Sequence, residues 1–176
     1  MKTYNVAVVG ATGMVGQRFL TLLNGHPWFK VKALAASARS AGKPYRQSVE
    51  GRWMMEGPIP AEAADLIVLD AQADAEKIAG MVDFILCAVD MKKEEIAKLE
   101  ERYAKLECPV VSNNSAHRHT PDVPMVLPEV NPEHLEIIAA QKKRLGTNRG
   151  FIAVKPNCSI QSYVPALHPL RPFGIK

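Results

Sequence analysis

The feature of this sequence that most constrains its fold is a regular alternation of strand-like and helix-like segments. Short apolar runs of this kind, bounded by glycine, proline or polar residues, are typical of buried parallel strands. They occur at residues 5–10, 29–37, 65–70, 82–90, 108–113 and 150–156. The alternation predicts an α/β fold with a doubly wound, mainly parallel sheet.

Three of the segments between these runs carry helix signals. Residues 14–25 have apolar side chains at helical spacing, and residues 91–106 have them at intervals of three and four. Residues 131–146 begin with Asn131 as the expected N-cap, followed by a proline, and end at Gly146. We therefore expect three helices that cover the sheet.

Composition narrows the class of protein. The hydrophobic content of 47% and the charged content of 23% are ordinary for a globular protein, and no apolar run approaches the roughly 20 residues that span a bilayer. The first residues, MKTYNVAVVG, pass directly into a strand pattern without a hydrophobic signal region. We therefore expect a cytoplasmic protein with no membrane partner.

The charge and the cysteines exclude further classes. The net charge of +4 is modest and the basic residues are mostly interleaved with acidic ones, so we expect no nucleic-acid partner. The three cysteines are too few for a disulfide framework and lack the Cys-x-x-Cys spacing of a zinc site. We expect reduced thiols and no metal.

The segment GATGMVG, residues 10–16, connects the first predicted strand to its helix. Glycines there allow an anionic ligand to approach the backbone, and the helix N-terminus offers unpaired N–H groups to a pyrophosphate. Thr12 departs from the G-x-G-x-x-G pattern, because it stands where a glycine normally does. The context favours a dinucleotide, and the alternative is a tight turn with a close helix contact.

The segment AASARSAGK, residues 35–43, follows the second predicted strand. A carboxylate commonly binds the ribose 2′-hydroxyl of NAD at this place, whereas here the polar residues are Ser37, Arg39, Ser40 and Lys43. This pattern suits a 2′-phosphate, hence NADP. The alternative is a solvated basic loop.

Cys158 stands at the expected first turn of a helix, directly after the last predicted strand. The positive end of the helix dipole favours the thiolate, which is the nucleophilic form of cysteine. Cys87 and Cys108 lie inside or at the start of apolar runs, where cysteine usually acts as a small buried hydrophobe. Cys158 is therefore the candidate nucleophile, with a purely structural role as the alternative.

Three ordered motifs resemble one enzyme family. VAVVGATGMVGQRF, SNNSAHRHTPDVPMVLPEVNPEH and VKPNCSIQ are together similar to the archaeal and fungal type of aspartate-semialdehyde dehydrogenase. The resemblance covers nearly the whole chain. It implies a Rossmann-like NADP-binding domain at residues 1–155. Residues 156–176 would form a catalytic-cysteine helix that leads into a second, catalytic and dimer-forming domain, which this chain lacks.

The resemblance also implies the activity. Members oxidise L-aspartate 4-semialdehyde to L-4-aspartyl phosphate, reversibly and with inorganic phosphate and NADP, through a cysteine thioester. In the cell the reaction serves lysine, threonine and methionine synthesis, including the diaminopimelate route. The implied partners are the small-molecule substrate and phosphate, and the full-length form is expected to be a homodimer or homotetramer.

Site residues follow from the same resemblance. Cys158 would be the nucleophile, Asn157 would help hold the substrate, and Arg118 would bind phosphate. The expected cofactor-binding residues are Gly10, Thr12, Gly13, Met14, Val15 and Gly16 at the pyrophosphate, Ser37, Arg39 and Ser40 at the adenosine phosphate, and Cys87, Ala88, Ser112 and Asn113 at the nicotinamide.

The family's catalytic histidine belongs to the second domain, and none of the histidines at positions 117, 119, 134 and 168 is a convincing substitute. We therefore expect residues 1–176 to form the amino-terminal half of the enzyme, with little or no activity alone. Two alternatives stay open: a non-catalytic NADP-binding module, and a related acyl-phosphate or acyl-CoA reductase.

Overall fold

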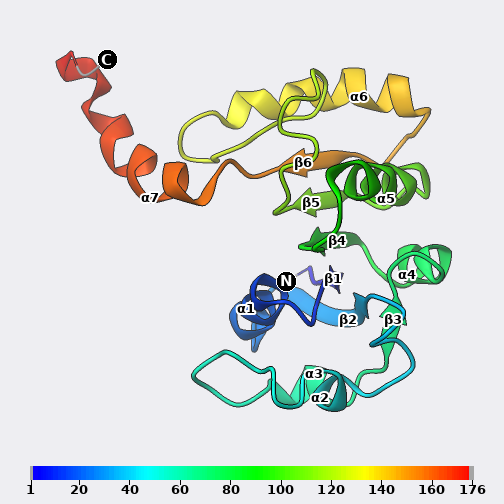
Figure 1. Cartoon of the computed structure of the whole chain (residues 1–176). Helices are drawn as coiled ribbons and strands as arrows, with labels where there is room; N and C mark the ends of the chain where they lie inside the picture. The colour runs from blue at the N-terminus through cyan, green and yellow to red at the C-terminus, as the bar shows by residue number, and fades with distance from the viewer. Residues whose placement is uncertain (1, 175–176) are drawn as a thin grey trace.

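The structure is a computed structural model that describes residues 2–174. Its six-stranded sheet has the order β3-β2-β1-β4-β5-β6, and each of these neighbouring pairs is parallel (Figure 1). The strands are β1 (Tyr4–Val9), β2 (Phe29–Ala36), β3 (Val68–Asp70), β4 (Phe84–Cys87), β5 (Val110–Ser112) and β6 (Ile152–Val154). The chain starts mid-sheet and builds outward in both directions, which is the Rossmann order. The predicted doubly wound parallel α/β fold is confirmed.

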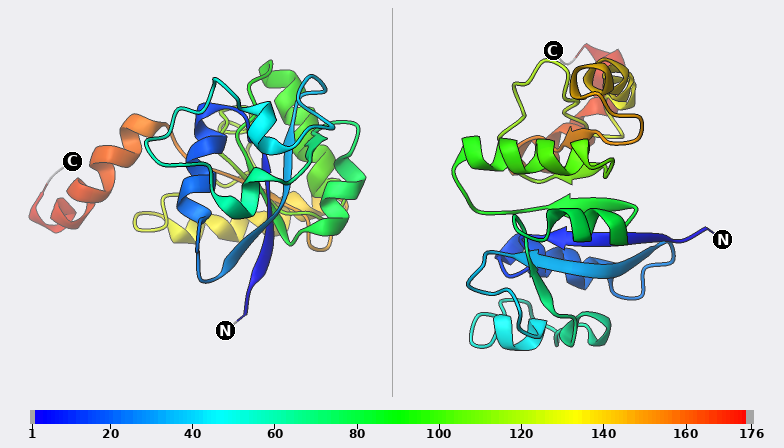
Figure 2. Two further views of the ribbon diagram at one scale, coloured as in Figure 1. Left: turned by 90° about the horizontal axis from the view of Figure 1, so that it is seen from below. Right: turned by 90° about the vertical axis from the view of Figure 1, so that its right-hand side faces the viewer.

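Helices cover both faces of this sheet (Figures 1 and 2). The α-helices are α1 (Met14–Leu23), α2 (Tyr45–Ser48), α3 (Ala61–Ala64), α4 (Ala75–Met81), α5 (Lys93–Lys105), α6 (Ile138–Leu145) and α7 (Cys158–Leu167), and 3-10 helices span Pro132–Ile137 and His168–Phe173. Helix α1 and the short α2 and α3 pack on one face, whereas α4, α5 and α6 pack on the other.

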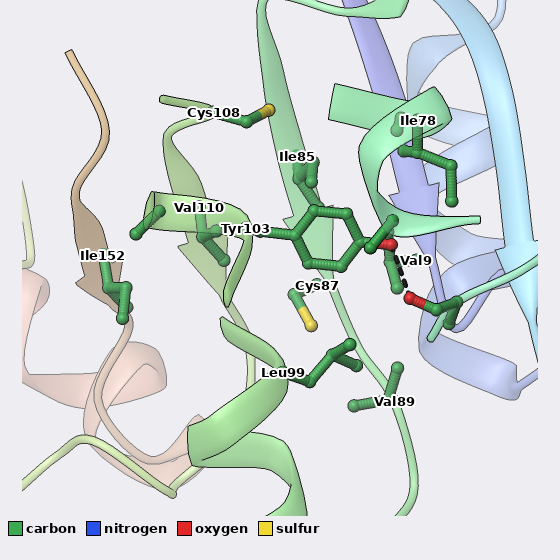
Figure 3. Packing of buried hydrophobic residues seen from close by; sticks show 14 of the residues in the cluster. Val9, Ile78, Ile85, Cys87, Val89, Leu99, Tyr103, Cys108, Val110 and Ile152 are labelled. Atoms are coloured by element: carbon green, nitrogen blue, oxygen red, sulfur yellow. Dashed lines mark hydrogen bonds between the residues drawn. The ribbon is translucent and has the colours of Figure 1, made fainter. Parts of the chain in front are cut away.

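Each face has its own hydrophobic core. Ile78 of α4, Ile85 of β4 and Tyr103 of α5 are fully buried on one face, as Figure 3 shows. The Tyr103 hydroxyl donates to the carbonyl of Ala71 at 2.7 Å, so this buried polar group is paired. On the other face, the buried Tyr45 hydroxyl donates to the carbonyl of Ala11 at 2.8 Å. Each hydroxyl group therefore joins a helix to a loop that follows a strand of the sheet.

The predicted segments match all six strands and helices α1, α5, α6 and α7, whereas the short helices α2, α3 and α4 were not predicted. The strand expected within residues 65–70 pairs with its neighbour only over Val68–Asp70. The helix expected over residues 131–146 begins as a 3-10 helix, and the Asn131 side chain caps neither part. Instead the amide accepts from the backbone of Leu127 and donates to the carbonyl of Met125. Asn131 therefore stands at the expected N-cap position, directly before Pro132, but its side chain closes the preceding loop and does not cap the helix.

The long polar stretch after β2 is held against α1 by one buried side chain. Gln17 Nε2 donates to the carbonyls of Thr12 and Arg52, at 3.1 and 2.8 Å, and its Oε1 accepts from the backbone of Met54 at 2.8 Å. Both N–H groups and the oxygen of this side-chain amide are therefore hydrogen-bonded. Because Gln17 lies in α1, the loop around Arg52 is fixed beside the first βα turn.

Helix α7 projects from the end of β6 and lies apart from the two packed layers (Figures 1 and 2). None of its residues is buried. Tyr163, Leu167, Leu170 and Phe173 are exposed, so this segment presents an apolar face. Among residues 2–174 no helix combines the length and the apolar character that a membrane crossing needs.

Candidate active site

The first βα turn is built around two glycines. Gly10 has φ +91°, and a Cβ there would lie 2.3 Å from the carbonyl oxygen of Ala88, so only glycine fits. Gly16, in the first turns of α1, packs so closely that its Cβ would lie 2.2 Å from the carbonyl oxygen of Gly10. Gly13 is the N-cap of α1 and makes no side-chain cap. The turn therefore leaves N–H groups of the helix N-terminus open to an anion.

A cavity of about 480 Å³ lies over this turn, at the carboxyl ends of β1 to β4. It is lined by Gly10, Thr12, Gly13, Ala36, Ser37, Ala38, Arg39, Arg52, Asp70, Ala71, Gln72, Ala88, Val89, Asp90 and Met91. Six of the expected cofactor residues meet here: Gly10, Thr12, Gly13, Ser37, Arg39 and Ala88. This is the crevice in which doubly wound sheets bind nucleotides.

A second, basic cavity adjoins the first, because Arg39 and Arg52 line both. Its other lining residues are Ser40, Lys43, Gln47 and Ser48. Three cations and two hydroxyl groups suit a phosphate, so the residues present fit the 2′-phosphate end of NADP. Sequence reasoning missed Arg52, because only the fold of residues 49–60 returns it to the loop after β2.

Two carboxylates also line the first cavity, although the loop after β2 contains none. Asp70 is the last residue of β3, and its Oδ1 accepts from the backbone N–H groups of Gln72 and Ala73 at 2.8 and 2.7 Å. Asp90 follows β4 and is exposed. The Asp70 carboxylate thus stabilises the turn that follows β3, the strand next to β2.

Several expected cofactor residues do not line either cavity. Met14 and Val15 are exposed on the first turn of α1, and Gly16 lies behind the turn. The Cys87 side chain points into the hydrophobic core between β4 and α5 (Figure 3), and burial raises the pKa of its thiol well above the usual range. The Cys87 thiol therefore does not face the cavity.

The last residue of β5, Ser112, and the next residue, Asn113, were also expected at the nicotinamide. Ser112 is buried and donates from Oγ to Oε1 of Glu100 at 2.5 Å, and Asn114 Nδ2 donates to the same oxygen at 3.1 Å. The Asn113 backbone N–H donates to the carbonyl of Cys87 at 2.8 Å. Sequence reasoning missed Glu100, a fully buried carboxylate on α5 that holds this turn from the core side.

Cys158 is the first residue of α7 and its side chain is exposed. Asn157 is the N-cap, and its Oδ1 accepts from the backbone of Ser159 at 2.9 Å. Lys155 Nζ donates to Cys158 Sγ at 3.3 Å. This hydrogen bond and the lysine charge lower the pKa of the Cys158 thiol, and Arg118 adds a smaller effect in the same direction. The predicted position at a helix N-terminus is confirmed, and the geometry favours a reactive thiol.

Arg118 connects this cysteine to the turn after β5. Its Nε donates to the carbonyl of Lys155 at 3.2 Å, and its Nη2 donates to the carbonyl of Asn113 at 3.4 Å. The guanidinium is therefore fixed between the ends of β5 and β6, and it contacts the backbone of Lys155, which lies three residues before Cys158 in the sequence. The structure brings Arg118, Asn113 and Cys158 into one region, which the sequence could propose only through the family resemblance.

The histidines in this half of the chain have structural contacts. His117 is buried, with Nδ1 3.1 Å from Thr120 Oγ1 and Nε2 3.3 Å from the carbonyl oxygen of Ala97. His134 lies 3.1 Å from the carbonyl oxygen of Met125. Across the described residues 2–174, no three His, Cys, Asp or Glu side chains are grouped to hold a metal ion.

Comparison with known proteins identifies the family. Residues 5–138 match the family described as semialdehyde dehydrogenase, NAD binding domain. The chain belongs to this family. The matched semialdehyde dehydrogenase region contains the glycine turn, both cavities and Arg118, whereas Cys158 lies beyond it.

Relatives extend the similarity over nearly the whole of this chain. It is similar to the aspartate-semialdehyde dehydrogenase of Archaeoglobus fulgidus, with 41% identity over 173 residues that cover 98% of this chain and 48% of that protein. It is 43% identical to the enzyme of that name from Methanothermobacter thermautotrophicus over 168 residues, which cover 94% of this chain and 45% of that protein. The chain spans about half the length of these curated relatives, and the predicted family resemblance is confirmed.

A solved structure agrees with this family assignment. The crystal structure of aspartate semialdehyde dehydrogenase with NADP from Candida albicans matches with a TM-score of 0.84 at 34% identity, over 98% of this chain and 48% of that chain. The similarity therefore includes residues 156–174, with α7 and Cys158, as well as the sheet.

Proposed function

We propose that this chain carries the cofactor-binding and nucleophile-bearing part of an NADP-dependent, phosphate-dependent aspartate-semialdehyde dehydrogenase. The observation that carries the proposal is the position of Cys158 relative to the glycine turn. Both follow strands of one parallel sheet, so both stand at the carboxyl-terminal edge of that sheet. A thiol that can bond a substrate carbonyl thus shares an edge with a cavity suited to a dinucleotide.

In this proposal Cys158 Sγ attacks the aldehyde carbon of L-aspartate 4-semialdehyde. A sulfur–carbon bond forms, and the carbonyl electron pair moves to oxygen. After loss of hydride from that carbon, the acyl group is held as a thioester. Asn157, the N-cap beside Cys158, is the proposed substrate contact.

Bound NADP supplies the hydride acceptor. The chain's own part is to bind it: the turn at residues 10–16 takes the pyrophosphate at the N-terminus of α1, and Arg39 takes the 2′-phosphate. Ala88 and Asn113, at the ends of β4 and β5, are the proposed nicotinamide-side contacts. Arg118 is the proposed phosphate site, because a guanidinium matches a tetrahedral oxyanion.

We further propose two functional segments. Residues 1–155 form the cofactor-binding domain, and residues 156–176 connect it to the remainder of the enzyme. The exposed apolar side chains of Tyr163, Leu167 and Leu170 favour this division, because such a face is normally covered in a complete protein. A dimeric or tetrameric full-length enzyme and a cytoplasmic location stay predictions.

A cofactor titration of the 176-residue chain tests the proposal. Isothermal titration should give tighter binding of NADP than of NAD. Arg39→Gln should weaken NADP binding by about tenfold or more, because a charged hydrogen bond to the phosphate is lost, and should leave NAD binding nearly unchanged. Arg46→Gln is the matched control, since Arg46 is a nearby arginine that lines neither cavity.

Equal binding of the two cofactors, or no binding of either, would contradict the proposed function. A second experiment distinguishes the dehydrogenase from a non-catalytic NADP-binding module. NADP and L-aspartate 4-semialdehyde are added to the chain, and the intact mass of the chain is measured. An acylated Cys158 would support the dehydrogenase and contradict a module that only binds cofactor. Turnover by the isolated chain at the rate of a complete enzyme would contradict the expected role of the second half.

A further inference from the structure

Lys155 occupies an unusual place beside the candidate nucleophile. It follows β6 directly, and the intervening Pro156 and Asn157 turn the chain so that its ammonium returns to Cys158. Nζ lies 3.3 Å from Cys158 Sγ and 3.1 Å from the carbonyl oxygen of Pro156. The first distance is within hydrogen-bond range for an acceptor as large as sulfur.

The backbone of Lys155 is held from two sides. Its N–H donates to the carbonyl of Ser112 at 3.0 Å, and its carbonyl accepts from Arg118 Nε at 3.2 Å. The side chain is half-buried. The lysine is therefore anchored to β5 and to the proposed phosphate-binding arginine, which limits the positions its ammonium can reach.

Among the residues that the structure describes, no carboxylate forms an ion pair with Lys155. The charged groups that act on the Cys158 thiol are Lys155 from the end of β6 and Arg118 from the loop after β5. Both are cations, so they act on the sulfur in the same direction.

We propose that Lys155 is a further catalytic residue, whose ammonium stabilises the Cys158 thiolate by a direct hydrogen bond. Its catalytic meaning rests on the proposed function, whereas its effect on the thiol does not. The lowered pKa of Cys158 agrees with this role, and the Lys155 hydrogen bond is its largest cause, ahead of the backbone contribution at the start of α7.

The same contact serves two steps of the proposed reaction. Before attack, it raises the fraction of Cys158 present as thiolate at neutral pH. In the second step a phosphate oxygen bonds to the acyl carbon, the carbon–sulfur bond breaks, and its electron pair returns to Sγ. The ammonium of Lys155 stabilises the thiolate that leaves, without transferring its proton.

Alkylation of Cys158 as a function of pH tests the proposal. Iodoacetamide is uncharged, so the lysine does not steer its approach. Peptide masses distinguish alkylation of the exposed Cys158 from alkylation of the buried Cys87 and Cys108. We expect Lys155→Met to slow alkylation of Cys158 at pH 7 by about two- to fivefold, the range for an exposed charge pair, and to move the pH midpoint upward.

Two further variants define the result. Lys155→Arg keeps the charge and should retain most of the wild-type rate, whereas Lys98→Met removes an exposed lysine on α5 and should change nothing. Equal pH profiles for the wild type and Lys155→Met would overturn the proposal, as would a loss of the same size in Lys155→Arg.

This assay contains neither cofactor nor aldehyde, so its outcome is separate from that of the NADP titration. Preferential NADP binding with an unchanged alkylation profile would overturn the role of Lys155 and leave the proposed function standing. A Lys155-dependent profile without preferential NADP binding would support the lysine–thiolate contact and contradict the proposed dehydrogenase.

Discussion

Replacing Gly16 by alanine should destabilise the fold through a single methyl group. A Cβ at this position would lie 2.2 Å from the carbonyl oxygen of Gly10 and 2.7 Å from Cα of Ala11. Both neighbours are backbone atoms, so no side-chain rotation can relieve the clash. Ordinary contacts of this kind begin near 3.5 Å, so α1 would have to move from the turn by about 1 Å.

The cost follows from this geometry. Overpacking a closely packed contact typically costs about 1–3 kcal/mol, and a clash with fixed backbone belongs at the upper end. Alanine is better than glycine within a helix by about 1 kcal/mol, which offsets part of the cost. We therefore expect a net loss of about 2 kcal/mol, which corresponds to a fall of about 4–8 °C in the melting temperature for a chain of this size.

Thermal unfolding monitored by calorimetry measures the effect. Gly13→Ala is the matched control, because its Cβ would meet only the carbonyl oxygen of Gly10, at an ordinary 3.6 Å, and Gly13 has φ −79°. We expect this variant to stay within about 0.5 kcal/mol of the wild type. A melting temperature for Gly16→Ala equal to that of the wild type, or above that of Gly13→Ala, would refute the packing argument.

Two predictions concern polar side chains that bind the backbone of β6 or of residues 148–150, which precede it. The Glu107 carboxylate accepts from the backbone N–H groups of Asn148, Arg149 and Gly150, which lowers its pKa. The stabilisation by ionised Glu107 is therefore complete above the unfolded-state pKa of about 4.3 and is lost as pH falls through the lower folded-state pKa. The urea midpoint of Glu107→Gln should therefore decline less between about pH 5 and 3 than that of the wild type. Parallel declines of the two proteins would contradict this prediction. Gln141→Leu should lower the free energy of unfolding, measured in urea, by about 2–3 kcal/mol. Gln141 Oε1 accepts from the buried backbone N–H of Ile152 at 2.6 Å, and that donor would lose its partner. A loss below about 0.5 kcal/mol would show that the donor finds another acceptor.

The elements of the sheet could be located from sequence because each strand and most helices are encoded locally. The apolar runs of β1 and β4 are nearly continuous, since helices cover both faces, and the spacing of Ile96, Leu99 and Tyr103 marks the buried side of α5. Asn131 occupies the expected N-cap position but makes no capping hydrogen bond, because its amide can bond either a helix end or a loop, and tertiary contacts with residues 125–127 decide between them.

The candidate site was predicted unevenly for a physical reason. The glycine turn and Cys158 are recognisable because their backbone environment, a strand followed by a helix start, is visible in the sequence. Cys87 was expected at the nicotinamide only through the family resemblance. Side chains of a strand alternate between faces, and the Cys87 thiol points into the core, as its apolar strand context indicates. Only the assembled sheet decides which face each side chain joins.

The sequence by itself determined the alternating α/β pattern, the glycine turn and the placement of a cysteine at a helix start, because these depend on residues within one or two turns of each other. The tertiary structure alone decided that Arg52 joins Arg39 and Lys43 in one basic cavity and that Arg118 meets the backbone at Lys155. Those contacts join segments far apart in the chain, and their geometry depends on strand order and on the packing of helices against both faces of the sheet.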